Sequence, residues 1–133
     1  MTIRVLSPET AARIAAGEVV GEQFCYVTTT GRATGRRHTI EIWFAIEGRT
    51  LYMLSGGRDR SDWVRNLLRI PETTVRIRER EFAGRARIVE DGDEGQLARR
   101  LLLNKYAPTY SGDLSEWGRT ALPVAVGLAI DEA

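Results

Sequence analysis

The chain has 133 residues, and its charges nearly balance, because 19 Lys and Arg against 18 Asp and Glu give a net charge of +1. Hydrophobic residues at 43% and charged residues at 28% are typical of a globular protein and exclude a disordered chain or a coiled coil. The balanced charge argues against a nucleic-acid binder. No apolar run approaches the roughly 18 residues that a membrane helix requires. This length predicts one domain over 1–133, with an N-terminal helix and its lead-in over 1–20 and the remainder over 21–133.

The usage of cysteine and histidine restricts both the compartment and the chemistry. Residues 1–18 carry an acid early and lack a continuous apolar segment, so no secretory signal peptide is expected. The single cysteine, Cys25, cannot form a disulfide within the chain, which fits a reducing compartment and predicts a cytoplasmic protein. With His38 as the only histidine, a Cys/His zinc site is excluded. Cys25 lies in a strand-like apolar run, where a free cysteine is usually inert core, so cysteine chemistry is not expected.

Apolar periodicity, interrupted by Gly, Pro and Ser, divides the chain into helices and strands. Ser7 and Pro8 are typical of a helix start, and Gly17 is a plausible stop. In chain order we expect a helix over 10–16, strands over 23–30, 38–46 and 50–54, a helix over 62–69, strands over 73–78 and 81–89, a helix that follows the acidic run 91–94 and extends through Tyr106, an irregular segment over 107–114, a short helical turn over 115–119, and a strand over 123–130.

Hairpins dominate this order of elements. The strand 38–46 should pair with 50–54, and 73–78 with 81–89, because the loops between them are too short to cross between parallel strands. Six antiparallel strands with helices at their edges predict an α+β fold in which the sheet curls into a small barrel.

Two loops that combine glycine and arginine are the strongest candidates for a binding site. The loop 31–37 (GRATGRR) has three arginines and no acid, and the loop 55–60 (SGGRDR) ends where a helix begins. Glycines allow the backbone to approach an anion, and guanidinium groups and helix N-termini bind phosphate or carboxylate. At one end of the barrel the two loops would form a single anion site; two separate solvated turns are the alternative. The glycine-rich signatures of common nucleotide sites are absent.

Aromatic residues gather around the irregular segment 105–118. Tyr106, Tyr110 and Trp117 there suit a flat ligand, although packing of the segment on the barrel explains them equally well. Trp63 shares a helix face with Leu67, which is typical of a core position, and the adjacent Asn66 either contacts a ligand or faces water.

Five motifs, in this order and spacing, resemble the deazaflavin-dependent nitroreductase family of split β-barrel flavin and deazaflavin oxidoreductases. They are TTTGRATGR at 28–36, Trp43-Phe44, LYMLSGG at 51–57, SDWVRNL at 61–67 and WGRTALPV at 117–124. The resemblance runs from about residue 26 to residue 126. It is specific through the combination of these motifs and not through any one of them.

The resemblance implies a split β-barrel that binds the reduced deazaflavin coenzyme F-420. The loop 31–37 would hold the phosphate and acidic tail of the coenzyme, and the loop 55–60 and the following helix would border the same groove. The residues that the resemblance assigns to the coenzyme are Thr30, Arg32, Thr34, Gly35, Arg36, Arg37, Ser55, Gly56, Gly57, Arg58, Arg60, Trp63 and Asn66. The family loop often has Lys where this chain has Ala33, so flavin mononucleotide (FMN) remains an alternative coenzyme.

A reduced deazaflavin donates a hydride, so the protein needs no metal or nucleophile of its own. The resemblance implies hydride transfer to a small electron-poor acceptor (a quinone, a nitroaromatic or an enone), with the segment 106–117 on the acceptor side. The proton would come from solvent or from Tyr106 or Tyr110. Two other functions fit the same residues: an FMN-dependent reductase, and a non-catalytic protein that binds a flavin or deazaflavin. Neither nucleic acid nor an integral membrane segment is expected, and a homodimer is compatible with the resemblance.

Overall fold

In residues 7–89 and 91–129, which the computed structural model describes, seven strands form one antiparallel sheet in the order β2-β1-β5-β6-β7-β4-β3. The expected lead-in at 1–6 and Ile130 of the last expected strand lie outside the described residues. The strands are β1 (Cys25–Thr30), β2 (Arg37–Ile42), β3 (Ala45–Glu47), β4 (Thr50–Ser55), β5 (Glu72–Ile77), β6 (Arg80–Ile88) and β7 (Leu122–Ala129). The helices are α1 (Pro8–Val19), α2 (Asp62–Arg69), α3 (Asp93–Tyr106) and α4 (Ser115–Thr120), with short 3-10 helices η1 (Arg58–Arg60) and η2 (Ala107–Thr109).

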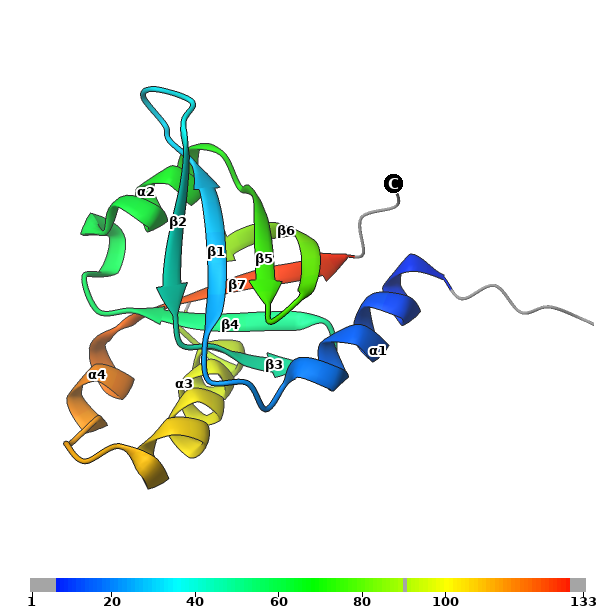
Figure 1. Ribbon diagram of the computed structural model, residues 1–133. Helices are drawn as coiled ribbons and strands as arrows, with labels where there is room; N and C mark the ends of the chain where they lie inside the picture. Colours follow the sequence, from blue (N-terminus) through cyan, green and yellow to red (C-terminus); the bar gives the residue numbers. More distant parts are fainter. Residues whose placement is uncertain (1–6, 90, 130–133) are drawn as a thin grey trace, which may run out of the picture.

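The sheet curls so that β1, β2 and β5 run across the direction of β4 and β7, with the core between the two halves (Figure 1). Burial along β1 alternates residue by residue, as expected of a strand with one face on the core. Val27 from β1, Met53 from β4 and Val75 from β5 are fully buried in the same hydrophobic cluster. The expected α+β barrel is thereby confirmed, with one strand more than the six expected.

The additional strand arises because the expected strand 38–46 breaks at Trp43 and Phe44. The first part, β2, pairs with β1, and only the second part, β3, pairs with β4. The expected pairing of the whole segment with 50–54 is therefore wrong. Phe44 is fully buried, and its backbone N–H and carbonyl both hydrogen-bond to the Tyr106 hydroxyl, so neither continues a strand ladder. The break turns the chain from one half of the barrel to the other.

β4 is buried on both faces, which explains its nearly continuous apolar sequence. Leu51 and Met53 face the barrel interior, and Tyr52 and Leu54 face a second hydrophobic cluster formed with α3. Helix α3 thus covers the outer side of this half of the barrel (Figure 1).

An ion pair and a tyrosine fasten the first turn of α3 to the sheet. Arg87 on β6 donates two hydrogen bonds of 2.6 Å to the Glu94 carboxylate. The Tyr52 hydroxyl donates a third, of 2.7 Å, to the same carboxylate. The hydrogen bonds from Arg87 and Tyr52 lower the pKa of Glu94 to about 2. The cluster therefore stabilises α3 as long as Glu94 is ionised.

Helix α1 begins as expected and ends later. The Ser7 side chain accepts a hydrogen bond from the Thr10 backbone N–H, which is the expected N-cap. The helix continues through Gly17 to Val19, so the expected stop at Gly17 is wrong. Ala12, Ala16 and Val19 are buried, and this packing outweighs the small helix penalty of one glycine. No helix among the described residues is long and apolar enough to cross a membrane.

Candidate active site

One buried side chain on α2 fixes the loop between β1 and β2. The Asn66 Oδ1 accepts a hydrogen bond from the Arg32 backbone N–H (3.2 Å) and another from Arg32 Nη1 (2.8 Å). The Asn66 Nδ2 donates to the Thr29 hydroxyl at 3.1 Å, so the same amide also reaches β1. Arg32 Nη2 completes the arrangement with an ion pair to Asp62 at 3.1 Å. The sequence placed Arg32 and Asn66 in one site, and the structure brings them into direct contact.

The loop, β2 and α2 enclose a cleft of about 550 Å³, which we name the basic cleft. A volume of this size lies within the range of roughly 300–1,000 Å³ that is usual for small-molecule and cofactor sites. Its lining combines polar groups with apolar surface from β2 and α2; the lining residues are Thr29, Gly31, Arg32, Ala33, Thr34, His38, Thr39, Ile40, Asp62, Trp63 and Asn66.

The loop conformation leaves backbone donors free. Gly35 has a positive φ of 73°, which favours glycine, and its N–H donates to the Gly31 carbonyl at 2.8 Å. The Gly31 N–H donates to the Arg36 carbonyl, and the Arg36 N–H donates to the Thr34 hydroxyl. Among the hydrogen bonds of the described residues, none uses the N–H groups of Ala33 and Thr34. Two free amides at the mouth of a cleft are a suitable donor set for an anion.

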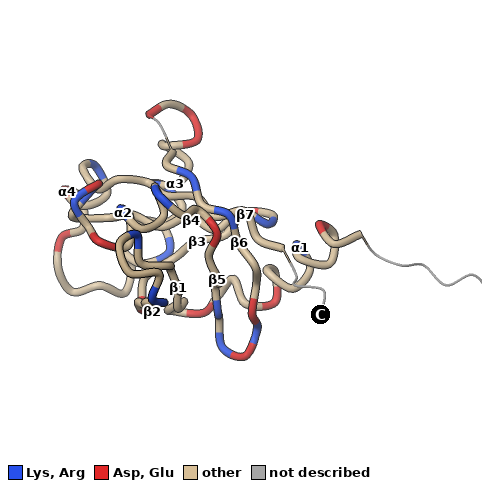
Figure 2. Tube along the Cα trace, turned by 90° about the horizontal axis from the view of Figure 1, so that it is seen from above, with Lys and Arg blue, Asp and Glu red and all other residues tan. Residues whose placement is uncertain are grey.

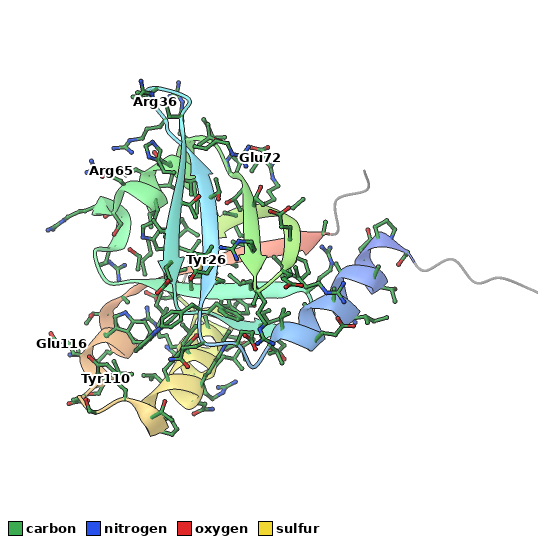
Figure 3. The ribbon with its side chains drawn as sticks, viewed as in Figure 1. Tyr26, Arg36, Arg65, Glu72, Tyr110 and Glu116 are labelled. Atoms are coloured by element: carbon green, nitrogen blue, oxygen red, sulfur yellow. The ribbon has the colours of Figure 1, made fainter. Side chains whose placement is uncertain are left out.

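The remaining arginines of this loop point in different directions. Arg36 lies at the tip of the loop (Figure 3), and the Arg37 guanidinium turns to β5, where Nη2 donates to the Thr74 hydroxyl at 3.2 Å. Blue segments beside β1 and β2 mark basic residues at this end of the molecule (Figure 2). Of the predicted site residues in and beside this loop, Thr30, Gly35, Arg36 and Arg37 do not line the basic cleft.

The second loop lines a separate hollow of about 470 Å³, formed by residues 56–61. Ser55 is buried, and its hydroxyl donates to the Arg58 carbonyl at 2.9 Å. A Cβ at Gly57 would lie 2.5 Å from the Ser61 hydroxyl oxygen, so a larger residue here would displace that hydroxyl. Arg58 Nη1 donates to the carbonyl of Thr120, at the end of α4. The two loops therefore do not share one cleft. They are neighbours, because Ser61 in this hollow is followed directly by Asp62 in the basic cleft.

An aromatic cluster forms around Trp43, at the break between β2 and β3. The Trp43 ring stacks on Tyr106 with 4.3 Å between centroids and 4° between planes. It meets the rings of Tyr110 and Trp117 edge-on, at 5.6 Å and 5.7 Å. The rings of Trp43, Tyr110 and Trp117 line a cleft of about 510 Å³, which we name the aromatic cleft; its lining is Phe24, Glu41, Ile42, Trp43, Leu54, Tyr110, Asp113, Leu114 and Trp117.

The two clefts follow one another along β2. Ile40 lines the basic cleft and Ile42 lines the aromatic cleft, and residues two apart on a strand point to the same side. Arg36 and Tyr110 mark opposite ends of this arrangement (Figure 3). The strand β2 therefore runs from the basic cleft to the aromatic cleft.

The two tyrosines expected as proton donors lie in different environments. Tyr106 is 1% exposed, and its hydroxyl accepts from the Phe44 N–H (2.9 Å) and lies 2.8 Å from the Gln23 carbonyl oxygen. Burial raises the pKa of Tyr106 to about 12. Tyr110 is 47% exposed and lines the aromatic cleft. The structure thus places Tyr110 at the cleft, and Tyr106 behind Trp43.

Sequence reasoning missed part of both clefts. His38 and Ile40 were not assigned to the site, although alternation along β2 would have placed them on one face once its pairing was known. Trp43 was not assigned to the site either, and it lines the aromatic cleft together with Trp117, which the sequence had already associated with a flat ligand. Cys25 and His38 occupy opposite ends of the β1–β2 ladder, because Cys25 pairs with Ile42 and His38 with Thr29. Burial raises the pKa of the Cys25 thiol to about 12, so this cysteine is no nucleophile.

Solved structures share the fold at low sequence identity. An F420-H2 dependent reductase superposes with a TM-score of 0.63 and 22% identity over 78% of this chain and 92% of that one. A putative 5-nitroimidazole antibiotic resistance protein from Bacteroides thetaiotaomicron gives a TM-score of 0.66 and 16% identity over 87% and 79%. An FAD-binding protein from Mesorhizobium loti gives 0.65 and 14% over 97% and 91%. These similarities confirm the fold.

No curated protein matches the chain significantly. The sequence model of one family, the F420H(2)-dependent quinone reductases, matches residues 8–129. This match confirms the expected kinship with deazaflavin-dependent oxidoreductases, and it confirms coenzyme F-420 as the cofactor of the family. Since the match covers nearly the whole chain, the protein belongs to the F420H(2)-dependent quinone reductase family.

Proposed function

We propose that this protein transfers a hydride from reduced coenzyme F-420 to a flat, electron-poor acceptor, with quinones as the foremost class. One observation carries the proposal: the basic cleft and the aromatic cleft follow one another along β2, with Ile40 in the first and Ile42 in the second. A ligand with an anionic end and a flat ring system can therefore place its charge at the loop and its ring toward Trp43. An acceptor can then reach that ring from the side of Tyr110 and Trp117.

The residues of the basic cleft fit the chemistry of the coenzyme. The guanidinium of Arg32, the exposed Arg36 and the free N–H groups of Ala33 and Thr34 would hold its phosphate and carboxylates. Trp63 and Ile40 would supply apolar surface for its ring, and Gly35 would shape the loop. The coenzyme, when bound, supplies the hydride. The residues of this chain bind it, orient it and exclude water from it.

The second loop would extend this binding surface. In this proposal, Gly56, Gly57, Arg58 and Arg60 border the groove beyond the first turn of α2, and Ser55 holds their conformation through the Arg58 carbonyl. Thr30 and Arg37 lie beside the cleft and pair with each other in the β1–β2 ladder. In this proposal the pair supports the loop that binds the coenzyme, and Arg37 adds a positive charge near it.

For the proton, we propose Tyr110 or solvent. Tyr110 lines the aromatic cleft and is exposed, so its hydroxyl can approach an acceptor that lies against Trp43. Tyr106 would instead be a positioning residue, because its ring stacks on the ring of Trp43 and holds it in place.

The test is anaerobic titration of the protein with reduced F-420, followed by addition of menadione. The proposal would be supported if reduced F-420 binds to the protein and is then oxidised only when both the protein and menadione are present. Binding that quenches coenzyme fluorescence without oxidation would identify a non-catalytic binding protein. Parallel titration with FMN examines the alternative coenzyme that Ala33 suggests; tight binding of FMN, with no binding of F-420, would overturn the choice of coenzyme.

A further inference from the structure

The aromatic cleft carries two carboxylates and no cationic side chain in its lining. Glu41 projects from β2, and Asp113 lies between η2 and α4, and both line the cleft with the aromatic rings. We infer that these two carboxylates make the cleft selective for uncharged or cationic flat acceptors and against anionic ones. The inference rests on the proposed function, whose acceptor class it narrows.

Both carboxylates are held in place. The Tyr26 hydroxyl donates to Glu41 Oε2 at 2.8 Å across the β1–β2 ladder. Asp113 Oδ1 accepts from the Ser115 backbone N–H (2.9 Å) and hydroxyl (2.6 Å) at the start of α4. These hydrogen bonds from Ser115 lower the pKa of Asp113, so it stays ionised at neutral pH. Within the described residues, neither carboxylate forms an ion pair.

Two cations lie near the cleft without entering it. The Arg76 guanidinium stacks over the Tyr26 ring at 4.4 Å from its centroid, and it donates to the Arg78 carbonyl. Lys105 Nζ donates to the carbonyls of Val20 and Phe44 and lies over the Phe44 ring, in the interior behind the aromatic cluster. Both are bound to backbone oxygens and do not line the cleft.

The two clefts differ in charge, because the Arg32 guanidinium in the basic cleft is paired with Asp62, whereas the carboxylates of the aromatic cleft have no paired cation among the described residues. The basic cleft presents Arg32, with Arg36 at the loop tip, whereas the aromatic cleft presents Glu41 and Asp113. Glu116, on α4, lies at the same end as Tyr110 (Figure 3). An anionic coenzyme tail is attracted to one end of the groove and repelled from the other, which fixes its direction. An anionic acceptor meets the same repulsion, because charges at short range interact strongly outside bulk water.

The first experiment compares two quinones that differ by one negative charge, 1,2-naphthoquinone and 1,2-naphthoquinone-4-sulfonate. The ratio of their kcat/KM values is measured for the unchanged protein, Glu41→Gln, Asp113→Asn and the double variant. Both substitutions keep an oxygen that can accept the observed hydrogen bonds. Glu9→Gln, in the first turn of α1 and outside the lining of the cleft, is the control with the same change in net charge.

Each cleft substitution should raise the relative kcat/KM of the sulfonate about two- to fivefold at low salt, and the double variant should raise it further. The effect should fade toward 1 M salt, where the Debye length falls to about 3 Å. Comparing ratios between variants cancels the different intrinsic reactivity of the two quinones. Ratios that do not change in the double variant, or that change equally in Glu9→Gln, would overturn the inference.

A binding measurement without coenzyme separates this inference from the proposed function. Naphthalene-2-sulfonate and 2-naphthylmethylammonium are titrated while the indole N–H signals of Trp43 and Trp117 are followed by NMR. The cation should bind more tightly than the anion, and the difference should shrink in the double variant. Equal binding, or no response at these two tryptophans, would overturn the inference. A charge preference without oxidation of reduced F-420 would refute the proposed function alone.

Discussion

The Asn66 side chain accepts hydrogen bonds from both the backbone and the guanidinium of Arg32, so one buried amide on α2 sets the path of the β1–β2 loop and the direction of its first arginine. The same amide donates to Thr29, which joins helix, strand and loop in one network. The basic cleft is therefore preformed, and its charge is positioned before any ligand arrives.

Replacing Arg32 with alanine should weaken binding of F-420 roughly ten- to hundredfold, because a charge-assisted hydrogen bond is lost. The salt dependence of binding should fall as well, since one cation is removed. Fluorescence titration at two salt concentrations measures both effects. Arg69→Ala, in the last turn of α2 and outside the lining of the cleft, is the control with the same charge change. Affinity equal to that of the unchanged protein would remove the loop from the site.

Replacing Asn66 with alanine should cost stability as well as affinity. Asn66 is 5% exposed, and its removal leaves the Arg32 N–H and the Thr29 hydroxyl without their partner. We expect the free energy of unfolding to fall by about 1–3 kcal/mol. Urea unfolding measures this loss, and a double-mutant cycle with Arg32→Ala measures coupling in coenzyme binding. Strictly additive effects on binding would contradict the view that Asn66 acts by positioning Arg32.

Substituting the two tyrosines one at a time should distinguish a role in stability from a role in catalysis. Tyr106→Phe leaves the buried Phe44 N–H without an acceptor, so it should reduce the free energy of unfolding by about 1–3 kcal/mol. Tyr110→Phe should leave stability nearly unchanged and lower kcat with a quinone at least tenfold if the hydroxyl donates the proton. Thermal unfolding and steady-state kinetics on both variants test the assignment. An unchanged kcat in Tyr110→Phe would indicate that the proton comes from solvent.

Glu94 should make stability fall in acid. Its pKa is lowered to about 2 in the folded protein, against a usual value of 4.5, by the hydrogen bonds from Arg87 and Tyr52. The stabilisation is complete above pH 4.5 and is lost as the pH falls toward 2, because protonation removes the charge that both partners bind. Since the carboxylate is 37% exposed, we expect a contribution of only about 1 kcal/mol. Unfolding measured from pH 6 to pH 2 should show a shallower decline for Glu94→Gln; an identical decline would exclude this cluster as its source.

Local sequence patterns correctly predicted much of the fold. The hairpin of β5 and β6 follows from alternation, and the end of α2 follows from Pro71; both signals act on neighbouring residues. The break at Phe44 could not be predicted in this way, because it depends on a hydrogen bond to Tyr106, which lies 62 residues further along the chain. Alternation continues through Trp43 and suggests one strand where the structure has two.

The candidate site was predictable in its parts and not in its arrangement. Arg32 and Asn66 were assigned together through the resemblance, and the structure shows their contact. The division of the two loops between separate hollows depends on how α2 sits against β1, which no local pattern encodes. Glu41 and Asp113 were overlooked as site residues, since an acid on an exposed strand or loop is usually only solvated, and only the folded chain shows that both lie beside Trp43.

Trp43 and Phe44 have two different roles, one in the cleft and one in the core, and together these roles limit which sequence changes are acceptable here. Phe44 closes the interior where the chain passes from β2 to β3, and Trp43 stands at the wall against which an acceptor would rest. Inserting or deleting one residue here would exchange the inward and outward positions of every side chain in the short strand that follows. Changes in acceptor preference are therefore more easily acquired by substitution in the segment 107–117, whose irregular backbone tolerates variation, than by altering this corner.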